Sequence, residues 1–215
     1  MQKIAILGAG GLGGEVKLLI DQINQHSLKW EFVGFYDDND GLKSSKKDHR
    51  IISPIEKVNE LKEKTALVVA VGDPRIKSEI VSRISENNSL WFPSLIHPQV
   101  YLDPTIEIGE GSIITIGNML TVGIRIGDHV LINLGCTIGH DVEIDDHSSI
   151  MPSTSISGNV KIGSKVLIGT GVKIINNCSI GNNSVIGAGS VVIRDVPENS
   201  VHAGVPSKPL IRKTK

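Results

Sequence analysis

From residue 108 to residue 192, an aliphatic residue occupies every sixth position of the 215-residue chain. Glycine often follows this residue directly, and a small or β-branched residue often follows four positions later. A period of six fits neither an α-helix nor a hairpin sheet, and it is typical of a solenoid. The fifteen positions show no slip of phase, and they are Ile108, Ile114, Leu120, Ile126, Ile132, Ile138, Ile144, Ile150, Ile156, Ile162, Ile168, Ile174, Ile180, Ile186 and Val192.

This repeat predicts a left-handed parallel β-helix (hexapeptide solenoid) over residues 93–215. Three short strands would form one triangular coil, with the aliphatic residue inside each face and residues 18 apart stacked in successive coils. Fifteen hexapeptides correspond to five such coils. At about 4.8 Å between neighbouring strands they would form a rod of roughly 24 Å.

The first 92 residues follow a different pattern, in which short β-rich runs alternate with helical ones. Strands are expected over 3–7, 31–36 and 66–71, and helices over 55–62 and 74–86. A further helix is expected where apolar residues recur at helical spacing, at Val16, Leu19, Ile20 and Ile23. The pattern predicts a small parallel α/β domain of Rossmann-like βαβ type over residues 1–92.

A glycine turn follows the first predicted strand, with Gly8, Gly10 and Gly13 at the spacing of a dinucleotide-binding loop. Asp37 and Asp38 follow near the distance expected for a ribose contact. An NAD-linked enzyme is therefore one hypothesis. Because the α/β pattern ends near residue 92 and leaves no second mononucleotide half, we do not expect NAD as a cofactor.

The amino-acid composition argues against some classes of binding partner. The chain has 22 Lys and Arg against 23 Asp and Glu, so no basic field favours nucleic acid or a membrane surface. No apolar run approaches the length of a membrane span. The two cysteines, Cys136 and Cys178, fall at inward positions on different faces of the predicted coil, so they should not form a disulfide. We expect a cytoplasmic protein.

His140 and its neighbours carry the candidate chemistry. Acyl transfer needs a base, which histidine supplies near neutral pH, and a carboxylate that orients the ring, for which Asp141 and Glu143 are both candidates. It also needs a donor for the developing oxyanion, and the Gly158 N–H lies one predicted coil further along. Asp141 can orient His140 only if the corner bends the backbone, because adjacent strand residues point to opposite faces.

A structural role for His140 is the competing interpretation. Corners of a β-helix are expected to face solvent and to tolerate histidine, and His129 and His147 also lie near corners with acidic neighbours. A solenoid with no catalytic role is a third hypothesis. The threonines after residue 105 do not keep one phase of the repeat, as a binding ladder would require.

Taken in order along the chain, the motifs resemble those of a known family. They are the amino-terminal GAGGLG turn, the six-residue repeat, Asn133 followed seven residues later by His140-Asp141, the segment GNVKIG and the closing GVPSK. Together they resemble the bacterial hexapeptide acyltransferases that modify sugars. More narrowly, they are similar to the sialic acid O-acetyltransferase family and its relatives that N-acetylate nucleotide-linked 4-amino-sugars in the bacillosamine and perosamine pathways.

The resemblance implies an acetyltransferase that uses acetyl-CoA as co-substrate, needs no metal and forms a homotrimer with the active site between subunits. It implies His140 as general base, Asp141 as its acidic neighbour and Asn133 as a residue that lines the pocket. The implied CoA contacts are Gly158, Thr170 and Ala188. The implied nucleotide-sugar contacts are Gly8, Gly10, Gly11, Gly13, Asp37, Asp38, Gly72 and Asp73.

The chain departs from the family pattern at two positions. Many relatives carry a second histidine nine residues after the first, where this chain has Ser149. Several carry histidine where this chain has Leu12 in the glycine turn. Because a free amine needs little activation beyond loss of a proton, the missing imidazole favours N-acetylation of a nucleotide-linked 4-amino-4,6-dideoxy sugar slightly over O-acetylation of sialic acid.

Overall fold

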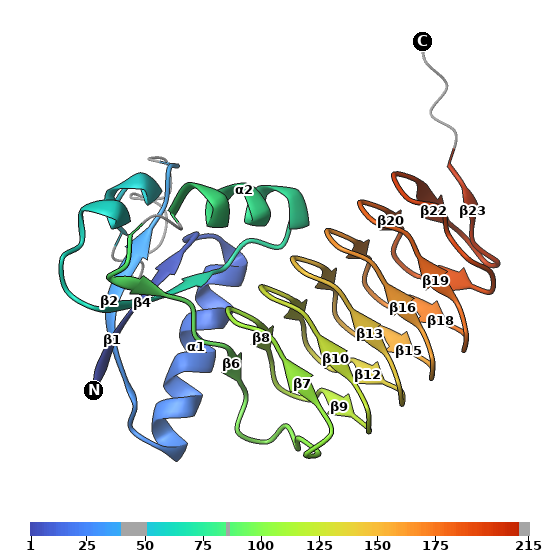
Figure 1. Ribbon diagram of the computed structural model, residues 1–215, viewed down its shortest axis with the longest axis horizontal. Helices are drawn as coiled ribbons and strands as arrows, with labels where there is room; N and C mark the ends of the chain where they lie inside the picture. Colours follow the sequence, from blue (N-terminus) through green and yellow to red (C-terminus); the bar gives the residue numbers. More distant parts are fainter. Residues whose placement is uncertain (40–50, 85–86, 211–215) are drawn as a thin grey trace, which may run out of the picture.

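The computed structural model describes residues 1–39, 51–84 and 87–210. An α/β part comes first, and a stack of triangular coils follows it and carries the carboxyl end to the far end of the molecule (Figure 1). In the first part, β1 (Gln2–Leu7), β2 (Trp30–Tyr36), β3 (Ile51–Ser53), β4 (Thr65–Val69) and β5 (Leu90–Trp91) form a parallel sheet in the order β3-β2-β1-β4-β5. Its helices are α1 (Gly11–His26), the 3-10 helix η2 (Ile55–Glu60) and α2 (Pro74–Ile84).

The sequence predicted the main elements of this part and missed the shortest ones. The segment predicted as a helix over 55–62 is a shorter 3-10 helix, because the chain leaves helical geometry at Leu61. The strand expected over 66–71 covers 65–69, and α2 is described to Ile84, with residues 85 and 86 outside the described residues. β3 and β5 were not predicted. They have three and two residues, too few for a periodic signal.

The hexapeptide prediction is confirmed. Each of the fifteen aliphatic positions ends a two-residue strand, and fourteen of these side chains are buried, with Ile108 packed against the same core. The strands are β7 (Glu107–Ile108), β8 (Ile113–Ile114), β9 (Met119–Leu120), β10 (Arg125–Ile126), β11 (Leu131–Ile132), β12 (Thr137–Ile138), β13 (Glu143–Ile144), β14 (Ser149–Ile150), β15 (Ser155–Ile156), β16 (Lys161–Ile162), β17 (Leu167–Ile168), β18 (Lys173–Ile174), β19 (Ser179–Ile180), β20 (Val185–Ile186) and β21 (Val191–Val192).

Three sheets form the faces of this left-handed β-helix, and the repeat strands within each pair in parallel. We call them the β7 sheet (β7, β10, β13, β16, β19), the β8 sheet (β6, β8, β11, β14, β17, β20, β22, β23) and the β9 sheet (β9, β12, β15, β18, β21). Paired residues are 18 apart, as Ile138 and Ile156 are. The β8 sheet extends beyond the repeat, with β6 (Leu95–Ile96) before it and β22 (Val201–Ala203) and β23 (Lys208–Pro209) after it.

The closing strands cover the end of the β8 sheet. β23 turns back antiparallel to β22 and carries Lys208, one of the basic residues near the carboxyl end. An antiparallel strand across the last coil hinders further end-to-end pairing. The other basic residues there, Arg212, Lys213 and Lys215, lie outside the described residues.

The two cysteines are free and buried, as expected. Cys136 precedes β12 in the β9 sheet, and Cys178 precedes β19 in the β7 sheet. Burial raises the pKa of both thiols. They are small core side chains of the coil.

One face of the coil is covered by the α/β part. Three outward positions of the first β8-sheet strands, Leu95, Ile113 and Leu131, are apolar and buried. They share a hydrophobic cluster with residues of α1 and β1, and α1 lies beside β6 (Figure 1). The division of the chain at residue 92 remains a prediction, because this core belongs to both parts.

Helix α2 also lies on the coil and inserts a lysine beneath itself. The Lys77 ammonium nitrogen donates to the Ser148 carbonyl at 3.2 Å and to Ser149 Oγ at 3.0 Å, and the side chain is 2% exposed. Burial lowers the pKa of Lys77 to about 7, against a smaller opposing effect of the Asp73 charge. The α2 interface therefore holds a lysine that is largely without charge above neutral pH.

The sequence pattern predicted that the corner histidines His129 and His147 face solvent, and His129 does not. His129 is buried, stacks on His147 with ring centroids 5.3 Å apart, and meets the Phe92 ring edge-on. Burial, with the nearby His147 and Lys77, lowers the pKa of His129 to about 4. The expectation failed because the α/β part covers this corner, which the repeat alone does not show.

Candidate functional site

His140 and Asp141 form the corner between the β9 sheet and the β7 sheet, directly after Gly139 and β12. Asp141 has a φ of 56°, in the left-handed region, so the chain bends sharply there. The bend turns two adjacent side chains toward each other, and His140 Nδ1 lies 2.8 Å from Asp141 Oδ2. The side chains are 57% and 62% exposed, so the pair is open to a ligand.

Gly158 lies one coil further along at the same corner, against the His140 ring. A Cβ at Gly158 would lie 2.4 Å from His140 Nε2, so only glycine leaves room for the imidazole. The Asn159 N–H donates to the His140 carbonyl at 2.9 Å and holds the two coils together. Among the described residues, the Gly158 N–H has no hydrogen-bond partner. The corner therefore combines a base, a carboxylate and an unused N–H.

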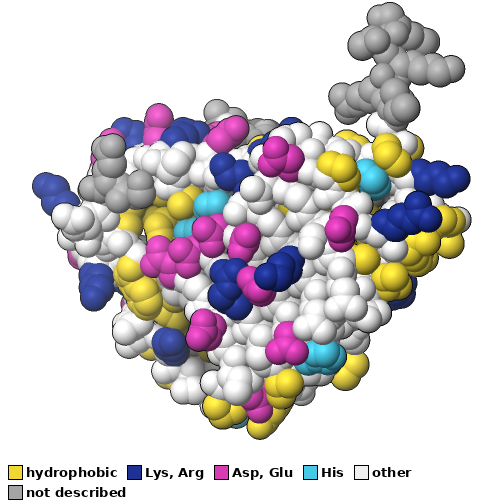
Figure 2. All heavy atoms as spheres, turned by 45° about the vertical axis from the view of Figure 1, so that its right-hand side comes forward, with side chains coloured by type: hydrophobic (Ala, Val, Ile, Leu, Met, Phe, Trp, Pro, Cys, Tyr) yellow, Lys and Arg dark blue, Asp and Glu magenta, His cyan; other side chains and the backbone are white. Residues whose placement is uncertain are grey.

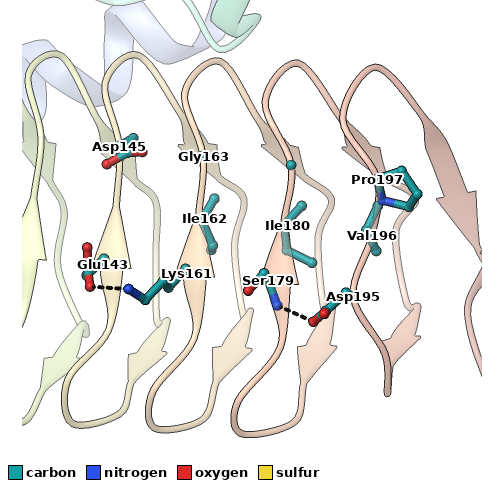
Figure 3. A pocket seen from close by; sticks show the side chains of 11 residues that line it. Glu143, Asp145, Lys161, Ile162, Gly163, Ser179, Ile180, Asp195, Val196 and Pro197 are labelled. Carbon is teal, nitrogen blue, oxygen red and sulfur yellow. Dashed lines mark hydrogen bonds and ion pairs between the residues drawn. The ribbon is translucent and has the colours of Figure 1, made fainter.

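Glu143, the other candidate to orient His140, is engaged elsewhere. Its carboxylate lies 2.7 Å from the Arg125 guanidinium and 3.0 Å from Lys161 Nζ, on the outside of the β7 sheet (Figure 3). These partners lower the pKa of the Glu143 carboxyl. Asp141 is therefore the carboxylate that contacts the ring.

The same sheet has a hollow of about 400 Å³ beside the Glu143–Lys161 ion pair (Figure 3). Further along it, Asp195 accepts the Ser179 N–H at 2.8 Å. None of the site residues carried over from the resemblance lines this hollow. The space-filling view in Figure 2 shows acidic and basic side chains intermixed, with no large region of one sign on that face.

Ser149 stands at the position where the sequence resemblance predicts a second histidine. It lies in β14 on the β8 sheet, fully buried, where it accepts the Lys77 hydrogen bond under α2. His140 lies at the corner between the other two sheets. Within one chain, Ser149 therefore contributes to the α2 interface.

The glycine turn after β1 contains two kinds of glycine. Gly8 and Gly13 are required by packing: a Cβ on Gly8 would lie 2.8 Å from the Ala70 carbonyl oxygen, and one on Gly13 would lie 2.1 Å from the Gly8 oxygen. Gly10 and Gly11 face open space, with nothing within 4 Å of an added Cβ. Helix α1 begins here without a side-chain cap. The turn thus leaves room for a ligand at Gly10 and Gly11, beside uncapped helix amides.

The acidic residues near this turn accept hydrogen bonds from backbone N–H groups. Asp37 Oδ2 accepts the Ala9 N–H at 2.6 Å, and Asp38 accepts the Ile55 N–H at 2.9 Å. Asp73 caps α2 through the Arg75 N–H at 2.9 Å. Because Asp37, Gly72 and the glycine turn follow β2, β4 and β1, they lie at one edge of the parallel sheet.

The remaining predicted residues lie at a different corner from His140. Asn133, Thr170 and Ala188 each follow a β8-sheet strand, at the corner between the β8 and β9 sheets. Asn133 is 7% exposed, and its Oδ1 accepts the Leu134 N–H at 2.7 Å. Within one chain, these three residues and the His140 corner flank opposite edges of the β9 sheet.

Sequence reasoning missed Met151 at the junction between the two parts. A Cβ on Gly72 would lie 3.3 Å from the Met151 methyl, and Met151 packs with Leu12 on the cluster shared by both parts. The apolar outward residues of the β8 sheet, such as Leu131, were the available signal that something covers this face.

Two absences concern only the described residues. There, no three histidine, cysteine, aspartate or glutamate side chains gather in a way that would hold a metal ion. Over the same part of the chain, no helix is long and apolar enough to cross a bilayer.

The fold and the corner site define a class: a hexapeptide-repeat transferase with an amino-terminal α/β part. Comparison with family profiles agrees, since the PglD N-terminal domain matches residues 3–84 and the bacterial transferase hexapeptide (six repeats) matches residues 159–194. A comparison with curated proteins found no match.

Solved structures make the assignment narrower. The acetyltransferase domain of PglB from Neisseria gonorrhoeae, in complex with acetyl coenzyme A, is 32% identical with a TM-score of 0.87, over 97% of this chain and 99% of that one. WeeI from Acinetobacter baumannii is 27% identical with a TM-score of 0.86, over 98% and 100% of the chains. PerB from Caulobacter crescentus, in complex with CoA and GDP-perosamine, is 24% identical with a TM-score of 0.84 over 98% of each chain and shares the fold.

The chain belongs to the family of hexapeptide-repeat sugar acetyltransferases that includes the PglB acetyltransferase domain. It is an acetyltransferase, as the sequence resemblance implied.

Proposed function

We propose that this chain transfers the acetyl group of acetyl-CoA to the 4-amino group of a nucleotide-linked 4-amino-4,6-dideoxy sugar, with His140 as the general base. The observation that carries the proposal is the His140–Asp141 contact of 2.8 Å, with the ring against Gly158. A base, an orienting carboxylate and a free N–H at one exposed corner match the needs of acyl transfer.

The roles follow from the geometry of the corner. With the Nδ1 proton donated to Asp141, the lone pair of His140 Nε2 is free to accept a proton from the attacking amine. The amine nitrogen forms its bond to the thioester carbonyl carbon, the carbon–sulfur bond breaks, and the proton taken up by Nε2 passes to the leaving sulfur to give the CoA thiol. In this scheme, the Gly158 N–H donates to the carbonyl oxygen as negative charge develops on it.

The proposed acceptor site is the glycine turn with its surroundings. Gly10 and Gly11 leave open space beside the uncapped start of α1, a favourable place for a pyrophosphate. Asp37, Asp38, Gly72 and Asp73 surround the same sheet edge and would contact the rest of the nucleotide-sugar. The profile match of the PglD N-terminal domain to this part, and the GDP-perosamine bound by the similarly folded PerB, support this assignment.

The proposed CoA site is a groove between subunits of a homotrimer. Gly158 lies at one edge of the β9 sheet, and Thr170 and Ala188 lie at the other. Residues at two corners of one chain would each line a groove with a neighbouring subunit. The acetyl coenzyme A bound by the PglB domain supports the choice of donor. We further propose a cytoplasmic location, in keeping with two unpaired cysteines.

O-acetylation of sialic acid is the alternative acceptor chemistry. A hydroxyl is a weaker nucleophile than an amine, so it would profit more from a second imidazole, and Ser149 stands at that position. The substitution therefore favours the amine slightly.

The experiment is a thiol-release assay with purified protein, acetyl-CoA and a panel of nucleotide-linked 4-amino-sugars and sialic acids. We expect release with at least one nucleotide-linked amino-sugar and none without acceptor. Release with sialic acids alone would replace the proposal by O-acetylation. No release with any member would reject both.

A further inference from the structure

Gly123 lies directly beneath the Asp141 carboxylate, one coil earlier at the same corner. The two corners are joined, because the Asp141 N–H donates to the Val122 carbonyl at 3.0 Å. The Gly123 N–H in turn donates to Thr105 Oγ1 at 2.8 Å. The backbone of Gly123 is therefore fixed against the residue that contacts His140.

An added side chain at Gly123 would occupy the space of the carboxylate. A Cβ there would lie 2.7 Å from Asp141 Oδ1, so the carboxylate would have to shift from its present position. Among the described residues, the Asp141 carboxylate has no other hydrogen bond or ion pair besides the contact with His140. The orientation of the Asp141 carboxylate therefore depends on its contact with His140 and on the free space above Gly123.

The backbone conformation alone does not explain a glycine at this position. Gly123 has a φ of 66°, and the matching left-handed position holds Asp141 (56°) in the next coil and asparagine in the two coils after it, at Asn159 (57°) and Asn177 (62°). Asparagine tolerates this conformation better than most residues. Other glycines of the coil also leave space for a side chain of the next coil: a Cβ on Gly111 would collide with the His129 ring, and one on Gly127 would lie 2.3 Å from Asp146 Oδ1.

We propose that Gly123 is a positioning residue for the His140–Asp141 pair: its missing side chain leaves the space from which the Asp141 carboxylate reaches His140 Nδ1. The proposal rests on the proposed function of His140 as base. Gly123 acts through Asp141, by holding the imidazole as the Nδ1–H tautomer with Nε2 free.

The test variant is Gly123→Asn, which accepts the backbone conformation and adds a Cβ under the carboxylate. The matched control is Gly135→Asn, because Gly135 has nearly the same φ of 65° and nothing within 4 Å of an added Cβ. We expect Gly123→Asn to lower kcat about 10-fold, part of the roughly 100-fold that a general base contributes, with the KM for acetyl-CoA changed less than about 2-fold. Gly123→Ala adds the same Cβ and replaces the variant if Gly123→Asn does not fold.

A double-mutant cycle separates positioning from a general loss of stability. In an Asp141→Asn background, adding Gly123→Asn should cost no further activity, because the interaction is already lost. Equal kcat values for Gly123→Asn and the Gly135→Asn control, or full additivity in the cycle, would overturn the proposal.

Nitrogen NMR of histidine-labelled protein provides a readout that needs no activity. At alkaline pH we expect the Nδ1–H tautomer for His140 in the wild type and the Gly135→Asn control, and a mixture of tautomers in Gly123→Asn. An unchanged tautomer would overturn the positioning role. If Gly123→Asn shifts the tautomer as described, yet the wild type transfers no acetyl group, the proposed function alone would be rejected.

Discussion

The contact between His140 and Asp141 depends on the conformation of one residue. Adjacent side chains of an extended strand point to opposite faces, and only the left-handed φ of 56° at Asp141 brings the carboxylate to Nδ1 at 2.8 Å. Gly158 then gives the ring its space one coil further along. Two consecutive residues thus supply both the imidazole and the carboxylate that contacts it.

Substitution of the two acidic residues near His140 distinguishes their roles. We expect Asp141→Asn to lower kcat at least about 10-fold, because an amide can present the wrong hydrogen-bonding group to the ring. Glu143→Gln should change kcat less than about 2-fold, since Glu143 pairs with exposed Arg125 and Lys161. Steady-state kinetics on both variants give the comparison, and the reverse order of effects would contradict this account.

At this scale the sequence predicted some contacts and not others. The 18-residue stacking followed from the repeat, so the placement of His140 against Gly158 could be predicted. The choice between Asp141 and Glu143 could not, because it depends on the corner conformation and on which cations lie beside each carboxylate. The burial of His129 depends on the α/β part that covers its corner.

Among the elements, α2 joins the two parts of the molecule through a buried lysine. Lys77 reaches the coil at Ser148 and Ser149, and among the residues that the structure describes no carboxylate accepts a hydrogen bond from it. Such a lysine is costly to protonate in place. The stability of this interface should therefore depend on pH.

The direction of this pH dependence follows from the pKa of Lys77, which burial lowers to about 7 from its ordinary value of 10.5. Between these values the unfolded chain binds the proton and the folded chain does not, so the free energy of unfolding should rise with pH, by up to about 1.4 kcal/mol per pH unit. Below about pH 7 both states bind the proton and this dependence ends.

Lys77→Met tests this element directly. We expect the variant to flatten the rise between about pH 7 and about pH 10 in urea unfolding, because it removes the titrating group. Lys64→Met, at an exposed lysine, should keep the wild-type slope. A Lys77→Met protein with an unchanged slope would show that the buried lysine does not titrate as described.

The strands of the coil could be predicted because each carries the same signal. Fifteen aliphatic positions at one spacing gave fifteen strands, each two residues long. β3 and β5 have no such support, and they exist because their neighbours β2 and β4 pair with them. η2 is a 3-10 helix of six residues, a form that apolar spacing alone does not distinguish from a short α-helix.

At the scale of the whole molecule, the two candidate sites lie on different parts of one chain. The sheet edge with the glycine turn lies on the α/β part, and the His140 corner lies on the coil, with a shared hydrophobic cluster between the parts. This arrangement suits a transferase that holds a large acceptor by its nucleotide and acetylates it at another point. In the proposed trimer, a neighbouring subunit would complete the groove at the His140 corner.

The most direct test of the central claim is the rate of thiol release by His140→Ala, with acetyl-CoA and a nucleotide-linked 4-amino-sugar that the wild type accepts. General-base removal should lower kcat at least about 100-fold, with thermal stability close to wild type because the side chain is 57% exposed. A His140→Ala protein that releases thiol at the wild-type rate would contradict the account.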